Sequence, residues 1–280
     1  MKKSDDDKIA VLGCGWMGLP LAIALIKKGF YVNGSTTTRQ KMSVLAGLNI
    51  VPFLVQIDTE ITGDPIQQFL DANLLIINIP PGRHRGIEND YVGKMKNLAE
   101  EVSKSPITKI IFVSSSSVYP ELNDIVTEKT PLDFQNEAAK NLILAEEIFK
   151  NLPRIKTTIL RFSGLFGPDR NPGRFFAGKE NIPNGLAPIN LIHLEDCIGL
   201  IKWIIEKDIW GETLNGVAPD HPQKMDFYGL ASEKYNQSRA QFIAERKAFK
   251  IVSSEKVIEE YGYQFKVPHL MNWLLQTPQN

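Results

Sequence analysis

The sequence of 280 residues predicts an α/β protein built on a doubly wound parallel sheet. Three observations support this fold class: short apolar runs typical of buried strands, helical segments that alternate with them, and a glycine-rich turn where the first strand meets the first helix. The composition is that of a globular protein, with 43 % hydrophobic and 23 % charged residues. A chain of this length can bury a core that needs no disulfide or metal to stabilise it.

The first predicted strand, Ile9–Leu12, leads through the sequence Gly-Cys-Gly-Trp-Met-Gly into a helix expected over Leu19–Lys28. A second strand begins at Phe30, which completes a βαβ unit. In a G-x-G-x-x-G turn the first glycine forms the turn, the second lets the backbone approach a pyrophosphate, and the third lets the helix pack closely on the strand. The pattern predicts a Rossmann-type domain whose cofactor site includes Gly13, Gly15, Trp16, Met17 and Gly18.

The segment Ile9–Ile26 carries no charged residue, so a membrane anchor is the alternative interpretation of this region. Asp5–Asp7 places negative charges where a signal peptide has positive ones, and Pro20 and three glycines weaken an apolar helix. We therefore expect no membrane insertion. Cys14 and Cys197 form neither a disulfide scaffold nor the spacing of a zinc site, which favours a cytoplasmic location.

The end of the second predicted strand indicates which dinucleotide binds. Proteins that select NAD usually place Asp or Glu about 20 residues after the first glycine, where it binds the ribose hydroxyls. This chain instead has hydroxyl side chains followed by a guanidinium group, among them Thr36, Thr38 and Arg39. These groups suit a 2′-phosphate, so we expect NADP, with NAD as the other possibility. The alternative is that Arg39 lies on a solvated loop.

Four further strands are expected at residues 49–56, 74–79, 109–113 and 157–161, with helices such as Tyr91–Lys104 between them. Ligands of such sheets bind beyond the carboxyl ends of the strands. This rule adds Pro80 and Pro81, after the fourth strand, and Ser114, at the end of the fifth, to the predicted cofactor site.

Several stretches resemble the extended short-chain dehydrogenases/reductases, also called the NAD-dependent epimerase/dehydratase family. They are residues 110–119 with their serine-rich end, 160–168, 191–197 and 214–217. Two features depart from the family pattern, because Leu12 stands at its first glycine and its Tyr-x-x-x-Lys pair is missing. Together with the ending at residues 260–268, these departures resemble the atypical YeeZ-like branch, which is defined better by sequence than by activity.

In typical enzymes of this family Ser, Tyr and Lys cooperate in proton transfer. The resemblance places the catalytic serine at Ser115, with Tyr119 as a substitute acid, although Tyr119 could equally pack as a buried aromatic. Lys140 stands where the lysine is expected, but the residue four positions earlier is Asn136, which cannot release a proton near neutral pH. The alternative for Lys140 is a solvated position on a helix over Gln135–Lys150.

The resemblance also implies a small C-terminal subdomain on the substrate side. We expect a nucleotide-binding domain of residues 8–170 and 187–213, and a subdomain of residues 171–186 and 214–280. Arg83 and Arg174 are candidates for binding substrate; Arg83 could instead be solvated, and Arg174 is a candidate by its position alone. His193 is expected to be structural.

The function expected is an NAD(P)-binding oxidoreductase or epimerase-like protein that acts on a small hydroxyl or carbonyl compound, including a sugar nucleotide. The alternatives are a non-catalytic NADP-binding sensor and, third, an enzyme similar to β-hydroxyacid dehydrogenases, whose all-helical second domain does not suit the strands predicted after residue 157. With 32 basic and 32 acidic residues, a nucleic-acid partner is not expected. The sequence leaves the oligomeric state open.

Overall fold

The computed structural model describes residues 8–81 and 90–276 and divides the chain into two compact units. The first unit comprises Met1–Val118, Asp133–Leu160 and Ile201–Thr213. The second unit comprises Tyr119–Leu132, Arg161–Leu200 and Leu214–Asn280. The structural boundaries therefore place residues 119–132, 161–170 and 187–200 in the second unit, whereas the sequence-based division assigns them to the nucleotide-binding domain.

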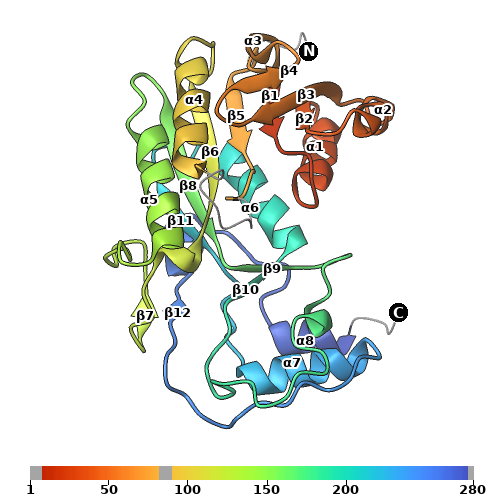
Figure 1. The fold of residues 1–280 in the computed structure, drawn as a ribbon, viewed down its shortest axis with the longest axis vertical. Coiled ribbons are helices and arrows are strands. Elements are labelled where there is room, and N and C mark those ends of the chain that lie inside the picture. Colours follow the sequence, from red (N-terminus) through yellow and green to blue (C-terminus); the bar gives the residue numbers. More distant parts are fainter. Residues whose placement is uncertain (1–7, 82–89, 277–280) are drawn as a thin grey trace. The chain divides into compact units, whose positions relative to one another are not determined.

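An eight-stranded sheet forms the centre of the fold, in the order β11-β8-β6-β5-β1-β2-β3-β4 (Figure 1). Strands β1, β2, β3, β5 and β6 pair in parallel, as the sequence predicts, and β4 pairs antiparallel with β3 at one edge. The predicted α/β fold class is thereby confirmed. The strands are β1 Lys8–Leu12, β2 Tyr31–Thr36, β3 Val51–Ile57, β4 Ile61–Gly63, β5 Leu74–Ile77, β6 Lys109–Ser115, β8 Lys156–Phe162 and β11 Thr213–Gly216.

The strand order reverses between β1 and β5, because the chain runs from β1 through β2 to β3 on one side and from β5 to β6 on the other. Parallel sheets of this kind bind ligands at such a switch point, beyond the carboxyl ends of the strands. The strand order therefore predicts that the ligand site lies at the residues that follow Leu12 and Ile77.

Helices cover both faces of the sheet within the first unit. Figure 1 shows α1 (Gly18–Lys27) and α2 (Gln40–Gly47) on one face, and α4 (Tyr91–Ser103) beside α5 (Glu137–Lys150) on the other. The short helix α3 (Ile66–Phe69) precedes β5. All four residues of β5 are buried, and Phe112 packs on Phe149 of α5 with ring centroids 5.3 Å apart. Burial on both faces explains why these strands are continuously apolar in the sequence.

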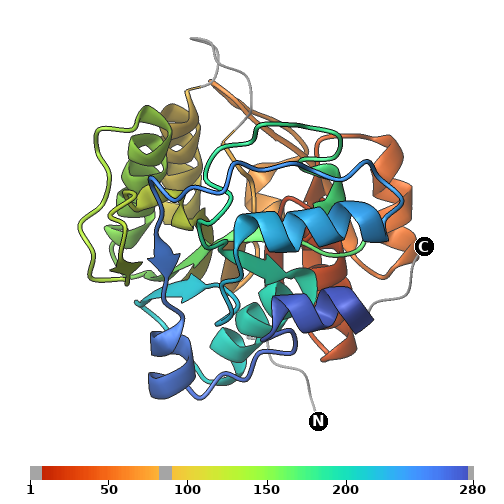
Figure 2. The same cartoon turned by 90° about the horizontal axis from the view of Figure 1, so that it is seen from below.

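The second unit has its own aromatic core. Phe166 contacts Phe227 and Trp273 edge to face, and Phe227 contacts Tyr228 in the same way. Figure 2 shows α7 (Lys224–Lys234) and α8 (Leu270–Gln276) side by side, and both helices contribute residues to this core. The elements of the unit are two pairs of short parallel strands, β9 (Gly164–Phe166) with β10 (Leu191–His193) and β7 (Ile125–Val126) with β12 (Ile251–Val252), the turn η3 (Pro172–Arg174), α7 (Lys224–Lys234), the π-helical turn η4 (Lys256–Glu260) and α8 (Leu270–Gln276).

The 3₁₀ turn η2 (Ser116–Val118) follows β6, and α6 (Leu194–Glu206) runs from the second unit into the first. Across residues 8–81 and 90–276, none of the helices combines the length and the apolar character that crossing a lipid bilayer requires.

Candidate functional site

The glycine turn after β1 has the tight geometry that the sequence predicts. Gly13 has a φ of +99°, and a side chain there would also meet the carbonyl oxygen of Asn78. A side chain on Gly18 would overlap the carbonyl oxygen of Gly13, so the third glycine allows α1 to start against the strand. Two polar side chains hold the turn: Ser35 Oγ accepts from the Gly13 N–H at 2.8 Å, and Asn78 Nδ2 donates to Gly13 O at 3.1 Å.

The second glycine of the turn differs from the other two. Gly15 is exposed, and an added Cβ would meet nothing within 4 Å. Helix α1 starts just beyond it with no side-chain cap at Met17 and no acidic residue in its first turn. An uncapped helix start offers N–H donors and the positive end of the helix dipole to an anion. The open space and the uncapped start together suit the pyrophosphate of a dinucleotide.

The remaining side chains of the turn pack within the protein. Met17 is buried and Trp16 is half-buried, while the thiol of Cys14 is enclosed near Gly34. Burial raises the pKa of the Cys14 thiol to about 12, so this cysteine stays protonated in the folded protein at neutral pH.

The three residues predicted to hold a 2′-phosphate lie at the end of β2 and in the segment that follows it. Thr36 is buried, and its hydroxyl accepts from the Thr38 N–H at 3.2 Å, so it shapes the turn. Thr38 and Arg39 are exposed, and Arg39 begins α2 as its N-cap residue. Among residues 8–81 and 90–276, Arg39 has neither an ion pair nor a hydrogen bond from its guanidinium group. Its charge is therefore available to a ligand.

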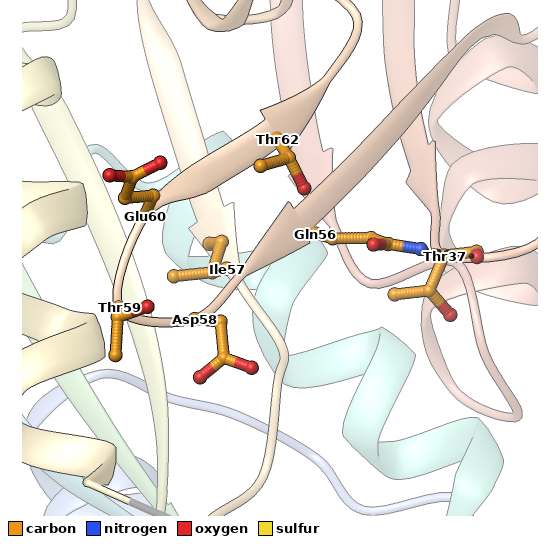
Figure 3. Close-up of a pocket in the computed structure, with 7 residues that line it drawn as sticks. All are labelled: Thr37, Gln56, Ile57, Asp58, Thr59, Glu60 and Thr62. Atoms are coloured by element: carbon orange, nitrogen blue, oxygen red, sulfur yellow. Dashed lines mark hydrogen bonds between the residues drawn. The ribbon is translucent and has the colours of Figure 1, made fainter.

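An open cleft of about 430 Å³ lies next to this segment, at the turn between β3 and β4 (Figure 3). Gln56 Nε2 donates to the carbonyl oxygen of Thr37 at 3.3 Å and thereby joins β3 to the segment after β2. The cleft residues, which the sequence analysis did not identify, are Thr37, Gln56, Ile57, Asp58, Thr59, Glu60 and Thr62. A run of polar residues directly follows the third strand, and this signal could have indicated Asp58, Thr59 and Glu60.

Helix α4 holds the β3–β4 turn in place. Asn97 Nδ2 donates to the carbonyl oxygen of Thr59 at 2.7 Å, and Lys94 pairs with Asp58 at 3.3 Å. The second carboxylate of the cleft, Glu60, is exposed and has no ion pair in the described part of the chain. The charge of Asp58 is thus balanced within the protein, and that of Glu60 is not.

Pro80 and Pro81 follow the end of β5, and the strand order places the switch point of the sheet there. Tyr91 Oη donates to the carbonyl oxygen of Ile79 at 3.2 Å and so fastens the start of this segment to α4. Arg83, a predicted substrate residue, lies outside the described residues.

Ser114 and Ser115 differ in what their hydroxyl groups contact. Ser114 is buried, and its Oγ donates to Oε1 of the buried Glu146 on α5 at 2.6 Å. Ser115 is half-buried, and its Oγ accepts from the Ser117 N–H at 3.1 Å. The Ser114 proton is therefore committed to α5, whereas the Ser115 hydroxyl can still donate its proton to a bound oxygen.

The Asn136 and Lys140 pair does not form a proton relay in this structure. The side chain of Asn136 caps α5 by accepting from the N–H groups of Ala138 and Ala139. Lys140 pairs with Glu137 on the helix surface at 3.5 Å. This arrangement matches the solvated alternative for Lys140, and the cap explains why Asn136 precedes the helix.

Tyr119 lies in a buried polar network of the second unit. Its hydroxyl donates to Asn215 Oδ1 at 2.8 Å and accepts from Arg161 Nη1 at 2.9 Å. Asn215 in turn donates its backbone N–H to Glu128 and its amide to the carbonyl oxygen of Ser253. Burial is the main cause of a raised pKa for Tyr119. The phenol is a poor proton donor in this setting, because its proton already has a partner.

The two other predicted residues of the second unit also differ from each other. Arg174 is exposed in η3. His193 is buried against the rings of Phe166 and Trp273, and its Nδ1 accepts from the Glu195 N–H at the start of α6. Burial lowers the pKa of His193. The geometry of His193 is that of a structural residue.

Comparison with known proteins gives matches over most of the chain. Residues 81–214 match the NAD dependent epimerase/dehydratase family, and residues 8–81 match the NAD binding domain of 6-phosphogluconate dehydrogenase. The chain is 33 % identical to Protein YeeZ of Escherichia coli strain K12 over 265 residues, which cover 93 % of this chain and 96 % of that protein.

Solved structures show the same fold at lower identity. UDP-glucuronic acid 4-epimerase from Bacillus cereus, in complex with NAD, has a TM-score of 0.77 and 20 % identity, with 95 % of this chain and 96 % of that chain covered. A putative NAD-dependent epimerase/dehydratase from Methylobacillus flagellatus has a TM-score of 0.76 and 23 % identity, with the same coverage.

The fold and the glycine turn define a nicotinamide dinucleotide-binding protein of the short-chain dehydrogenase/reductase type. The identity shared with Protein YeeZ then shows that the chain belongs to the NAD-dependent epimerase/dehydratase family, in its YeeZ-like branch. The resemblance noted in the sequence is confirmed. The separate match of residues 8–81 to the NAD binding domain of another dehydrogenase agrees with the departure of Leu12 from the epimerase/dehydratase pattern.

Proposed function

We propose that this protein is an oxidoreductase or epimerase-like enzyme that binds a nicotinamide dinucleotide at the carboxyl ends of β1 and β5. The observation that carries the proposal is the open space at Gly15 in front of the uncapped start of α1, beside a turn held by Ser35 and Asn78. A bound dinucleotide would supply hydride transfer there, and the N–H groups at the start of α1 would hold its pyrophosphate.

The dinucleotide proposed is NADP. Arg39 offers an uncompensated positive charge at the end of β2, and the exposed Thr38 hydroxyl lies next to it in the sequence. A guanidinium group binds phosphate through charge-assisted hydrogen bonds. Glu60 opposes this preference, since it adds a negative charge to the neighbouring cleft. NAD remains the competing cofactor.

The substrate proposed is a small hydroxyl or carbonyl compound, which includes sugar nucleotides. Ser115 is the residue assigned to orient the substrate oxygen, because its hydroxyl proton is available after accepting from Ser117. Neither Tyr119 nor Lys140 is assigned proton transfer, because their polar groups are engaged by other residues.

A non-catalytic NADP-binding sensor is the second candidate. The specific observation in its favour is that Asn136 caps α5 and Lys140 lies at the helix surface, so the described part of α5 supplies no Tyr and Lys pair. A sensor needs the dinucleotide site and does not need proton transfer.

Hydride transfer separates the two candidates. We expect the native protein to transfer hydride with at least one member of a substrate panel, either from NADPH to an aldehyde or from a hydroxy acid or sugar nucleotide to NADP, and Ser115→Ala to slow this turnover by about 10²-fold or more. Ser117→Ala is the matched control, because it removes a neighbouring hydroxyl and keeps the backbone N–H that bonds Ser115. Tight NADPH binding without turnover of any panel member would favour the sensor.

A further inference from the structure

Two adjacent glutamates of helix α5 have different surroundings. Glu147 is half-buried and pairs with Lys150 at 2.9 Å on the helix surface. The side chain of Glu146, in contrast, is fully buried. Taking a carboxylate out of water is costly, and an apolar side chain of similar volume is often at least as stable at such a position. The burial of Glu146 therefore points to a role other than stability.

The carboxylate of Glu146 binds the end of strand β6. The hydroxyl group of the buried Ser114 donates to Glu146 Oε1 at 2.6 Å, which is a short distance for a bond between a hydroxyl group and a carboxylate. Ser114 directly precedes Ser115, the last residue of the strand. The bond therefore fastens β6 to α5 one residue before the hydroxyl group that is assigned to the substrate oxygen.

The same carboxylate acts on the segment that follows β5. Helix α4 lies beside α5 (Figure 1), and its first residue, Tyr91, is buried. Burial and, to a lesser extent, the charge of Glu146 raise the pKa of Tyr91, so the phenol stays protonated at neutral pH. Its hydroxyl donates to the carbonyl oxygen of Ile79 at 3.2 Å. Glu146 thus influences the carboxyl ends of both β5 and β6, where parallel sheets bind ligands.

We propose that Glu146 is a positioning residue, which holds Ser114 and thereby fixes the hydroxyl group of Ser115 for the substrate oxygen. A hydrogen bond restricts the strand end to one orientation, because it is directional, whereas apolar packing is not. Ser115 Oγ accepts from the Ser117 N–H at 3.1 Å, so a shift of the strand end would weaken that bond and redirect the Ser115 proton. The inference rests on the proposed function, which assigns the role of Ser115.

An apolar replacement of the hydrogen-bonded pair separates positioning from stability. Removing only one partner leaves a buried polar group without its bond, which lowers stability whatever the role of the pair. The double variant Ser114→Ala with Glu146→Leu removes both partners and leaves no such group. If the pair served stability alone, this variant would keep both the fold and the turnover. If Glu146 positions Ser115, the variant keeps the fold and loses turnover.

The test compares unfolding in urea, the affinity for NADPH and kcat at saturating cofactor. We expect the double variant to keep the unfolding midpoint and to bind NADPH within about threefold of the native affinity, while its kcat falls at least about tenfold. Glu146→Gln keeps an acceptor for the Ser114 proton and should retain kcat within about threefold. Glu147→Leu is the matched control, because it makes the same exchange one residue along, at the helix surface, and should behave like the native protein.

Hydrogen exchange of the Ser117 amide, followed by NMR, provides a readout that needs no turnover. We expect exchange at least about tenfold faster in the double variant and unchanged in Glu146→Gln, with the amide of Phe112 in the same strand as the internal reference. Unchanged exchange at Ser117, or an unchanged kcat in the double variant, would overturn the proposal. If the native protein transfers no hydride, the proposed function fails, and the exchange measurement still tests positioning.

Discussion

Arg39 is the residue on which the cofactor preference depends. Its guanidinium group is exposed and has no internal partner in the described part of the chain, so its charge is available to a 2′-phosphate. We expect the native protein to bind NADPH more tightly than NADH, and Arg39→Ala to remove most of the difference. Calorimetric titration of both cofactors into both proteins measures this. Equal affinities in the native protein would refute the preference.

Glu60 acts in the opposite direction. It is the cleft carboxylate that no internal cation balances among the described residues, whereas Asp58 pairs with Lys94. We expect Glu60→Gln to tighten NADPH binding by about two- to tenfold, because it removes the repulsion, weakened by solvent, between this carboxylate and the 2′-phosphate. NADH lacks that phosphate, so its binding should stay nearly unchanged. Glu60→Asp keeps the charge and serves as the control. An unchanged ratio of the two affinities in Glu60→Gln would show that this carboxylate does not influence selectivity.

At the scale of elements, helix α5 shows which structural features the sequence alone could predict. The helix and its approximate bounds were predictable from its apolar periodicity, and the solvated alternative for Lys140 agrees with the structure. The capping role of Asn136 was also encoded locally, since Asn is a favoured N-cap residue. Residues 136 and 140 also have the spacing of the family's catalytic pair, and this second interpretation obscured the cap.

Other features depend on contacts between distant segments and were not predictable. Tyr119 bonds to Arg161 and Asn215, which lie on β8 and β11, so no local pattern shows that its hydroxyl is occupied. The antiparallel strand β4 has three residues, too few for a periodic signal, and the cleft at its turn forms only when it pairs with β3. The parallel strands, by contrast, were predictable because each is continuously apolar.

The capping of α5 leads to a test on the element itself. We expect Asn136→Ala to lower the free energy of unfolding by about 1 kcal/mol, because two N–H groups lose their acceptor. Lys140→Ala removes only an exposed ion pair and should cost about 0.5 kcal/mol or less. Urea denaturation measures both. If Lys140→Ala left stability intact but slowed hydride transfer tenfold or more, the lysine would have a catalytic role after all.

At the scale of the whole molecule, the buried His193 and the half-buried His221 make stability depend on pH. Burial lowers the pKa of His193 and of His221, so the native state favours their neutral forms. Their contribution is complete above the ordinary value of 6.5 and is lost as the pH falls below it, because the unfolded chain takes up the protons first. Carboxylates with a lowered pKa, such as Glu101, change the stability only at lower pH, where they become protonated.

The free energy of unfolding should therefore decrease between pH 7.5 and pH 5. His193→Gln should reduce this slope, since glutamine does not titrate and can accept the hydrogen bond from the Glu195 N–H. Urea denaturation at a series of pH values provides the measurement. An equal slope in the variant would assign the pH dependence to other groups.

The central claim is that the glycine turn between β1 and α1 binds a dinucleotide, and Gly15 allows the most direct test. Gly13 and Gly18 support the fold itself, whereas a side chain on Gly15 meets only open space in the protein. We expect Gly15→Val to keep the circular dichroism spectrum and the unfolding midpoint of the native protein. In a calorimetric titration with NADPH, the native protein should bind and the variant should not, because the branched side chain occupies the space of the pyrophosphate. Binding of NADPH by both proteins with equal affinity would contradict the claim.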